Sequence, residues 1–175
     1  MHNARRIAIR GGEHRYEAIV GARLLPEVAT LLPKQLHSRS CALVCDETTA
    51  RLYGEAVAEM LRAGGSAVTL ITVAPGEEAK SLENVATICD QMARANLDRS
   101  SFLIGLGGGV IGDLSGFVAA TFHRGISHVQ VPTTLLAMVD SSIGGKTGVN
   151  SHAAKNLIGA IHHPALIVAD VETLR

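Results

Sequence analysis

The feature that most constrains this sequence is an apolar run that leads directly into a cluster of glycines and then into a helical pattern. Residues Phe102–Leu106 have the composition of a buried strand, and Gly107, Gly109 and Gly112 follow at the spacing G-x-G-x-x-G. This order is typical of an α/β domain that binds a dinucleotide, because the diphosphate lies on the helix N-terminus. Glycines at such a turn can also serve close packing alone, so both interpretations stay open.

One element of the dinucleotide fingerprint is absent. An acidic residue is expected about 20 residues after the glycines, at the end of the next strand, where it holds a ribose. That position is occupied by Pro132, Thr133 and Thr134. We therefore do not expect the site of an ordinary Rossmann dehydrogenase, and the threonines either cap a helix or contact a ligand.

Strand-like and helix-like segments alternate through the middle of the chain. The expected strands are Ile7–Arg10, Tyr16–Val20, Cys41–Cys45, Ala67–Val73, Phe102–Leu106, Val129–Val131 and Leu166–Ala169. The expected helices are Leu24–Leu32, Thr48–Ala63, Ser81 to Asn96, Val110–Phe122 and Thr133–Val139, with a loop or hairpin at Ser142–Asn150 and one helical turn at Asn156–Ala160. This alternation predicts an α/β fold, a Rossmann-like, doubly wound, mostly parallel sheet with helices on both faces, in one domain over residues 1–175.

Composition excludes several classes of partner. Sixteen basic residues balance 16 acidic ones and there is no Trp, so neither a field for nucleic acid nor a stacking surface is expected. No apolar run approaches the roughly 20 residues of a membrane span, and no signal peptide is apparent. Cys41, Cys45 and Cys89 lack a C-x-x-C pair, and we interpret them as reduced core thiols of a cytoplasmic protein.

Polar residues follow the expected strands, where a parallel sheet gathers its ligand contacts. Asp46 ends one strand, and Glu77 with Lys80 lies in a strand-to-helix loop. These side chains could hold ribose hydroxyls, although Glu77 and Lys80 could equally be a solvated ion pair. Asp113, placed in the first turn of the helix after the glycines, either stabilises the helix dipole or bonds a ligand group.

A second set of polar residues indicates a phosphorylated ligand. The set comprises Arg124, Asp140, Lys146, Lys155 and Asn156. Each could be a solvated surface residue alone, but together, beside a glycine-rich turn, cations and hydrogen-bonding groups suit negative oxygens and hydroxyls. The histidines lack metal-ligand spacing, and we interpret His123, His128, His152, His162 and His163 as loop or core residues.

These motifs resemble the 3-dehydroquinate synthases of the shikimate pathway. The resemblance rests on Gly107–Phe117, His123–Gly125, Gln130–Leu136, Val139–Thr147 and Lys155–Gly159, and it runs from about Ile7 to the end of the chain. It covers the amino-terminal, NAD-binding half of the family. The Val139–Thr147 segment separates the family from its aminocyclitol- and valiolone-forming relatives. The resemblance implies a carbon–oxygen lyase that converts 3-deoxy-D-arabino-heptulosonate 7-phosphate to 3-dehydroquinate and phosphate, with NAD as a resident catalyst.

The resemblance also implies roles for individual residues. Cofactor contacts would come from Asp46, Gly76, Glu77, Lys80, Gly108, Gly109, Val110, Ile111, Gly112, Asp113, Thr133, Thr134, Lys146, Lys155, Thr173 and Leu174. Catalytic or substrate contacts would come from Arg124, Asp140, Lys146, Lys155 and Asn156, with Arg124 on the substrate phosphate across a homodimer interface. A divalent metal, zinc or cobalt, would be held by one Glu and two His of a carboxy-terminal helical domain that these residues do not include.

The last residues follow a strand and resemble the start of a helix, which suggests a fragment cut at a domain boundary. We therefore expect these 175 residues alone to be inactive. Two other functions stay open: an NAD-binding module without chemistry, and a related sugar-phosphate cyclase with another substrate.

Overall fold

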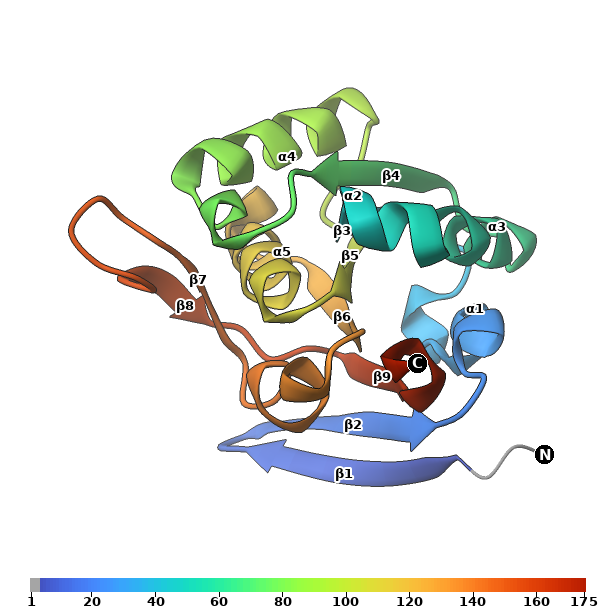
Figure 1. Ribbon diagram of the computed structural model, residues 1–175. Coiled ribbons are helices and arrows are strands. Elements are labelled where there is room, and N and C mark those ends of the chain that lie inside the picture. Colours follow the sequence, from blue (N-terminus) through green and yellow to red (C-terminus); the bar gives the residue numbers. More distant parts are fainter. Residues whose placement is uncertain (1–3) are drawn as a thin grey trace.

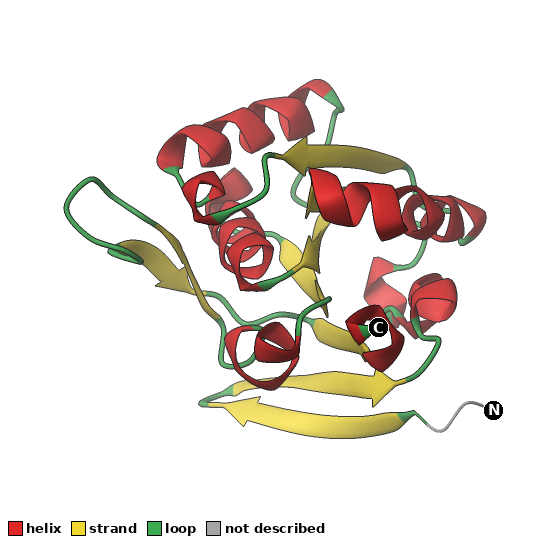
Figure 2. Cartoon of the chain, in the orientation of Figure 1, coloured by secondary structure: helices red, strands yellow, loops and turns green. Residues whose placement is uncertain are grey.

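A seven-stranded sheet forms the centre of the computed structural model, which describes residues 4–175. Its strands, in spatial order, are β1 (Arg5–Gly11), β2 (His14–Gly21), β9 (Leu166–Asp170), β6 (Ser127–Pro132), β5 (Phe102–Gly107), β3 (Cys41–Asp46) and β4 (Val68–Val73). All neighbours pair in parallel except β1 and β2, which form an antiparallel hairpin at one edge. The predicted doubly wound, mostly parallel sheet is confirmed (Figures 1 and 2).

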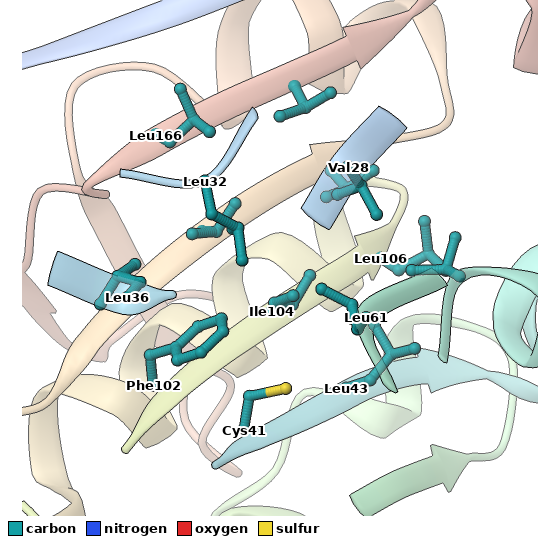
Figure 3. Packing of buried hydrophobic residues seen from close by; sticks show 14 of the residues in the cluster. Val28, Leu32, Leu36, Cys41, Leu43, Leu61, Phe102, Ile104, Leu106 and Leu166 are labelled. Atoms are coloured by element: carbon teal, nitrogen blue, oxygen red, sulfur yellow. The ribbon is translucent and has the colours of Figure 1, made fainter. Parts of the chain in front are cut away.

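Two hydrophobic cores lie on opposite faces of this sheet, because successive side chains of a strand point to opposite sides. Leu43 and Ile104 belong to the core shown in Figure 3, whereas Val44 and Leu103 belong to the other. β3 and β5 are buried on both faces, which explains their continuous apolar sequences. Helices α1 (Val28–Leu31) and α3 (Glu55–Ala63) cover the first core, and α4 (Leu82–Arg94) and α5 (Gly109–Thr121) cover the second.

The helix boundaries follow local signals. Ser81 caps α4 by accepting a hydrogen bond on Oγ from the Asn84 N–H at 3.2 Å, as predicted. The predicted helix Thr48–Ala63 is present as α2 (Glu47–Thr49), a π-helical turn (Ala50–Gly54) and α3. The predicted helix Leu24–Leu32 is shorter, with a 3₁₀ turn at Leu25–Glu27 before α1.

One predicted element is wrong. Asn156–Ala160 does not form a helical turn, because Ile158–Ile161 is a strand, β8, that pairs antiparallel with β7 (Lys146–Val149). Gly148 and Gly159 face each other in this hairpin, and a Cβ on Gly159 would collide with the Thr147 carbonyl. Close pairing of two backbones therefore determines the structure here, in place of a local helical turn. The hairpin extends beside α5 (Figure 1).

The cysteines are free thiols, as predicted. Cys41 and Cys45 lie in the core, and burial raises the pKa of each to about 12. Cys89 is only half-buried and packs against the second core, so the expectation of a core position is met in part for it. Between residues 4 and 175, no helix combines the length and the apolar character that crossing a membrane requires.

Candidate functional site

The carboxyl ends of the parallel strands border a cleft of about 540 Å³, which we call the glycine cleft. Because β3, β4, β5 and β6 run in the same direction, the residues that follow them meet at one edge of the sheet. The predicted site residues in its walls are Asp46, Gly76, Gly108, Gly109, Val110, Ile111, Thr133, Thr134 and Thr173. Residues predicted from separate motifs are thus brought together.

The glycines of the turn have different roles. Gly107 and Gly112 serve packing: a Cβ on Gly107 would lie 2.7 Å from Ile111, and one on Gly112 would lie 2.9 Å from Gln130 Oε1. Gln130 also donates from Nε2 to the Gly112 carbonyl at 3.0 Å, which fixes the start of α5 against β6. The packing interpretation therefore holds for Gly107 and Gly112, whereas Gly108 and Gly109 line the cleft and their contact with a ligand stays a prediction.

The start of α5 is suited to an anion. The first N–H groups of a helix have no partner within the helix, and no side chain caps this one at Gly108. A helix N-terminus of this kind attracts phosphate through its free N–H groups and its dipole. Across the cleft, Gly76 has a φ of 106°, which only glycine adopts without strain, and an added Cβ there would meet nothing within 4 Å.

A second cleft, also about 540 Å³, lies between α5 and the β7–β8 hairpin, and we call it the hairpin cleft. Its walls include Asp113, Asp140, Ser141, Lys146 and Asn156. The two clefts adjoin, because a Cβ on Gly109 would lie 2.9 Å from Ser141 Oγ. Three of the five predicted catalytic residues are therefore in one cavity, next to the glycine turn.

A buried lysine connects the walls of the hairpin cleft. The side chain of Lys80 is 4% exposed, and Nζ donates to Asp113 Oδ2 at 2.7 Å and to Asn156 Oδ1. Glu77 Oε1 lies 3.9 Å from the same Nζ. The alternative of a Glu77–Lys80 ion pair is confirmed as a contact, but its lysine is not solvated, because residues far away in the sequence bury it.

Asp113 differs in position from the prediction. Since α5 begins at Gly109, Asp113 lies in its second turn, and the first turn carries no acidic residue. The interpretation as a helix-dipole residue is therefore wrong, and the carboxylate faces Lys80 instead. Burial raises the pKa of the Asp113 carboxyl, and the hydrogen bond and charge of Lys80 oppose this rise.

Two site residues escaped the sequence analysis. Asn150 donates from Nδ2 to Glu77 Oε1 at 2.9 Å and accepts on Oδ1 from the Asn156 N–H at 2.9 Å. Asp170 is buried, and its carboxylate accepts from the backbone N–H groups of Arg23, Leu24, Leu25 and Glu172. For Asp170 the available signal was a polar residue directly after an expected strand, the same signal that identified Asp46, whereas the sequence offered no such signal for Asn150.

Asp46 itself caps a helix. Its carboxylate accepts from the Thr49 N–H at 2.9 Å and from the Thr49 hydroxyl at 3.0 Å. These bonds fix the side chain at the border of the glycine cleft.

Six predicted residues do not line either cleft: Glu77, Lys80, Gly112, Arg124, Lys155 and Leu174. Lys155 is exposed in the loop that follows β7. Arg124 lies in a tight turn of left-handed backbone after α5, with φ 50° at His123, 67° at Arg124 and 122° at Gly125. α5 begins at the glycine turn, at the carboxyl end of β5. Arg124 lies past the other end of this helix, just before the amino end of β6. Its predicted contact across a dimer interface stays a prediction.

The histidines lie in the core and in loops, as predicted. His128 is buried, its ring stacks on His162 with centroids 5.0 Å apart, and burial lowers its pKa to about 3. His123 is in the exposed turn before β6. Within residues 4–175, no group of three or more His, Cys, Asp or Glu side chains is arranged to hold a metal ion.

Solved structures share this arrangement. A crystal structure of 2-deoxy-scyllo-inosose synthase complexed with carbaglucose-6-phosphate, NAD+ and Co2+ superimposes with a TM-score of 0.89 at 26% identity, covering 97% of this chain and 47% of that one. The 2-epi-5-epi-valiolone synthase ValA from Streptomyces hygroscopicus subsp. jinggangensis 5008, with NAD+ and Zn2+ bound, gives a TM-score of 0.81 at 33% identity, covering 97% and 46%. Fold and site together define a domain of the sugar-phosphate cyclase class.

The sequence identifies the family within that class. Residues 70–175 match the family model described as 3-dehydroquinate synthase N-terminal, so the chain belongs to the 3-dehydroquinate synthase family. The chain is 53% identical over 165 residues to the 3-dehydroquinate synthase of Symbiobacterium thermophilum, covering 94% of this chain and 46% of the relative. It is 46% identical over 164 residues to that of Caulobacter vibrioides, covering 93% and 44%. The chain thus spans less than half the length of these curated relatives.

Proposed function

We propose that this chain is the NAD-binding part of a 3-dehydroquinate synthase, a lyase that converts 3-deoxy-D-arabino-heptulosonate 7-phosphate to 3-dehydroquinate and phosphate in aromatic amino acid biosynthesis. The observation that carries the proposal is the glycine turn at the junction of two clefts, with Lys80 holding Asp113 and Asn156 together in the walls of the hairpin cleft. One cleft offers uncapped helix N–H groups for a diphosphate, and the other gathers Asp140, Lys146 and Asn156 for a polyhydroxylated, phosphorylated substrate.

The residues of the glycine cleft fit NAD. Any side chain at Gly108 or Gly109 would contact Thr134 or Ser141, so the backbone there can approach a ligand only as glycine. The uncapped start of α5 would take the diphosphate. Asp46 and Gly76 in the cleft wall, with Glu77 and Lys80 from the turn that follows Gly76, would take the adenosine side. Thr133, Thr134, Thr173 and Leu174 would complete the contacts. NAD, when bound, accepts a hydride from the substrate and later returns it.

The hairpin cleft would hold the substrate and the nicotinamide. Lys146 and Lys155 supply positive charge for phosphate oxygens, whereas Asp113 and Asp140 accept hydrogen bonds from hydroxyls. Lys80 holds Asp113 and Asn156 in fixed orientations before any ligand arrives, which reduces the entropy lost on binding. No step is assigned to a metal within residues 4–175, since these residues bring no suitable ligand cluster together.

Two alternatives are retained as competing outcomes. A related cyclase would act on a different sugar phosphate, but identity is 53% to a 3-dehydroquinate synthase, against 26% and 33% to the two other cyclases. An NAD-binding module without chemistry would bind the cofactor and release no phosphate. We also propose that the full protein is a cytoplasmic homodimer in which Arg124 contacts the substrate bound to the partner subunit.

Calorimetric titration with NAD tests the proposal directly. We expect weak binding by the wild-type chain and a further loss of about tenfold in affinity for Glu77→Gln, which weakens a charge-assisted hydrogen bond to ribose. Glu78→Gln, a neighbouring exposed carboxylate, is the matched control and should bind as wild type. Failure of the wild-type chain to bind NAD would refute the assignment.

The chemistry is tested separately by phosphate release from the heptulosonate phosphate, with added zinc and NAD. We expect no release by the 175 residues alone, together with binding of the substrate to the NAD-loaded chain. Zinc-dependent release would contradict that expectation and would make His162 and His163 the candidate zinc ligands. NAD binding without any substrate binding would favour the module alternative.

A further inference from the structure

Asn150 connects the turn that carries Glu77 and Lys80 to Asn156 in the loop after β7, although no proposed NAD or substrate contact involves it. It directly follows β7, and it bonds to three other parts of the site. Its backbone N–H donates to the Lys80 carbonyl at 2.9 Å, and its side chain bonds both Glu77 and Asn156. The residue thus lies between the proposed ribose carboxylate and the loop that carries Lys155.

The bond to Asn156 closes the loop between β7 and β8. Residues 152–157 are exposed, and Asn156 has a φ of 54°, a left-handed conformation that needs support from its surroundings. Asn150 Oδ1 accepts the Asn156 N–H, while Lys80 holds the Asn156 side chain. Ser151 adds bonds only inside the loop, where its Oγ accepts from the Ala153 and Ala154 N–H groups.

The bond to Glu77 fixes one carboxylate oxygen only. Asn150 Nδ2 donates to Glu77 Oε1, and none of the residues that the structure describes donates a hydrogen bond to Oε2. That second oxygen is available for ribose hydroxyls. An amide is required at position 150 because it donates to a carboxylate and accepts from an N–H at the same time.

We propose that Asn150 is a positioning residue that couples nucleotide binding at Glu77 to the order of the loop bearing Lys155 and Asn156. The proposal rests on the proposed NAD site. A ribose bound to Glu77 immobilises its carboxylate, this immobilises the Asn150 amide, and the amide then holds the Asn156 N–H. Binding of the adenosine end would thereby prepare the loop for the substrate.

Trypsin reports the state of the loop, because it cleaves after Lys155 only when the loop opens. Cleavage of a transiently opened segment follows the population of the open form. Asn150→Ala removes the bond to Asn156, so we expect cleavage about tenfold faster than in wild type without nucleotide, about 1.4 kcal/mol. Asn150→Asp keeps an acceptor for the Asn156 N–H, so its unliganded rate should stay near that of wild type. An Asn150→Ala rate equal to wild type would overturn the positioning role.

ADP tests the coupling, since it can occupy the ribose site without carrying a nicotinamide to Lys155. Saturating ADP should slow cleavage after Lys155 severalfold in wild type. Asn150→Asp should lose this protection, because its carboxylate cannot donate to Glu77 and repels it. Ser151→Ala is the matched control: it loosens the loop internally and should keep the protection ratio of wild type.

The outcomes separate the two proposals. Equal ADP protection in wild type and Asn150→Asp, with ADP binding verified by calorimetry, would overturn the coupling and leave the NAD site intact. Absence of ADP and NAD binding in wild type would overturn both the NAD site and the coupling. The unliganded comparison of Asn150→Ala with wild type tests the loop contact in either case.

Discussion

Replacement of Lys80 by methionine should destabilise the fold strongly. The lysine is 4% exposed, and its loss leaves the Asp113 carboxylate without its 2.7 Å partner and Asn156 Oδ1 without its donor. Removing one member of a buried ion pair costs about 3–5 kcal/mol, and we expect the lower end because Asp113 is 21% exposed. At 2–4 °C per kcal/mol for a chain of this size, the melting temperature should fall by about 6–12 °C.

The effect should depend on pH in a defined direction. Burial raises the pKa of Asp113 and Lys80 opposes that rise, so Lys80→Met should raise the pKa further. A carboxyl with a raised folded-state pKa favours the fold when it is protonated and loses that contribution as the pH rises through the folded pKa. The difference in melting temperature between variant and wild type should therefore be larger at about pH 8 than at about pH 5.

Differential scanning fluorimetry at the two pH values measures this difference. Lys34→Met is the matched control, because Lys34 is exposed and should change stability by no more than about 0.5 kcal/mol. A Lys80→Met melting temperature equal to that of the control, or a gap that widens on acidification, would refute the buried-pair argument.

Three further outcomes are expected. Lys146→Ala should lower the affinity of the NAD-loaded chain for the heptulosonate phosphate about tenfold to hundredfold, since a charge-assisted bond is worth about 1.5–3 kcal/mol; unchanged calorimetric affinity would count against its role. Gly76→Ala should cost about 1–2 kcal/mol in urea denaturation, because its φ of 106° strains any side chain although the space is open; wild-type stability would contradict this. A thiol reagent should modify Cys89 in the native chain, whereas Cys41 and Cys45, buried with pKa values of about 12, should react only on unfolding; mass spectrometry should find Cys89 labelled first.

Strands with continuous apolar sequence could be predicted because a strand that is buried on both faces is apolar or small at every position of its own sequence. Cys41–Cys45 and Phe102–Leu106 lie between two cores, so every residue is apolar or small, and the glycine turn follows at the predicted edge. Strand β8 could not be predicted in the same way. Ile158–Ile161 depends on Lys146–Val149 for its pairing, and the glycines that permit this pairing carry no information about their partner.

The candidate site shows the same limit. Lys80 follows two glutamates and looks solvated in the sequence, whereas its burial comes from Asp113 and Asn156, which are 33 and 76 positions away. Asn150 was overlooked because a single amide after a short strand has no distinctive pattern. Residues in glycine-rich or charged motifs were identified, and residues that hold those motifs in place were not.

The Asp170 carboxylate connects the amino-terminal segment of the chain to the glycine cleft, although residues 4–25 line no part of that cleft. This one group binds the N–H groups of residues 23–25 and the N–H of Glu172, across 147 positions of sequence from Arg23. Glu172 immediately precedes Thr173, a wall residue of the glycine cleft. Deletion of residues 1–25 would therefore remove this contact from the turn that carries Thr173. A lower nucleotide affinity of the shortened chain would show that the contact between residues 23–25 and Asp170 stabilises the glycine cleft.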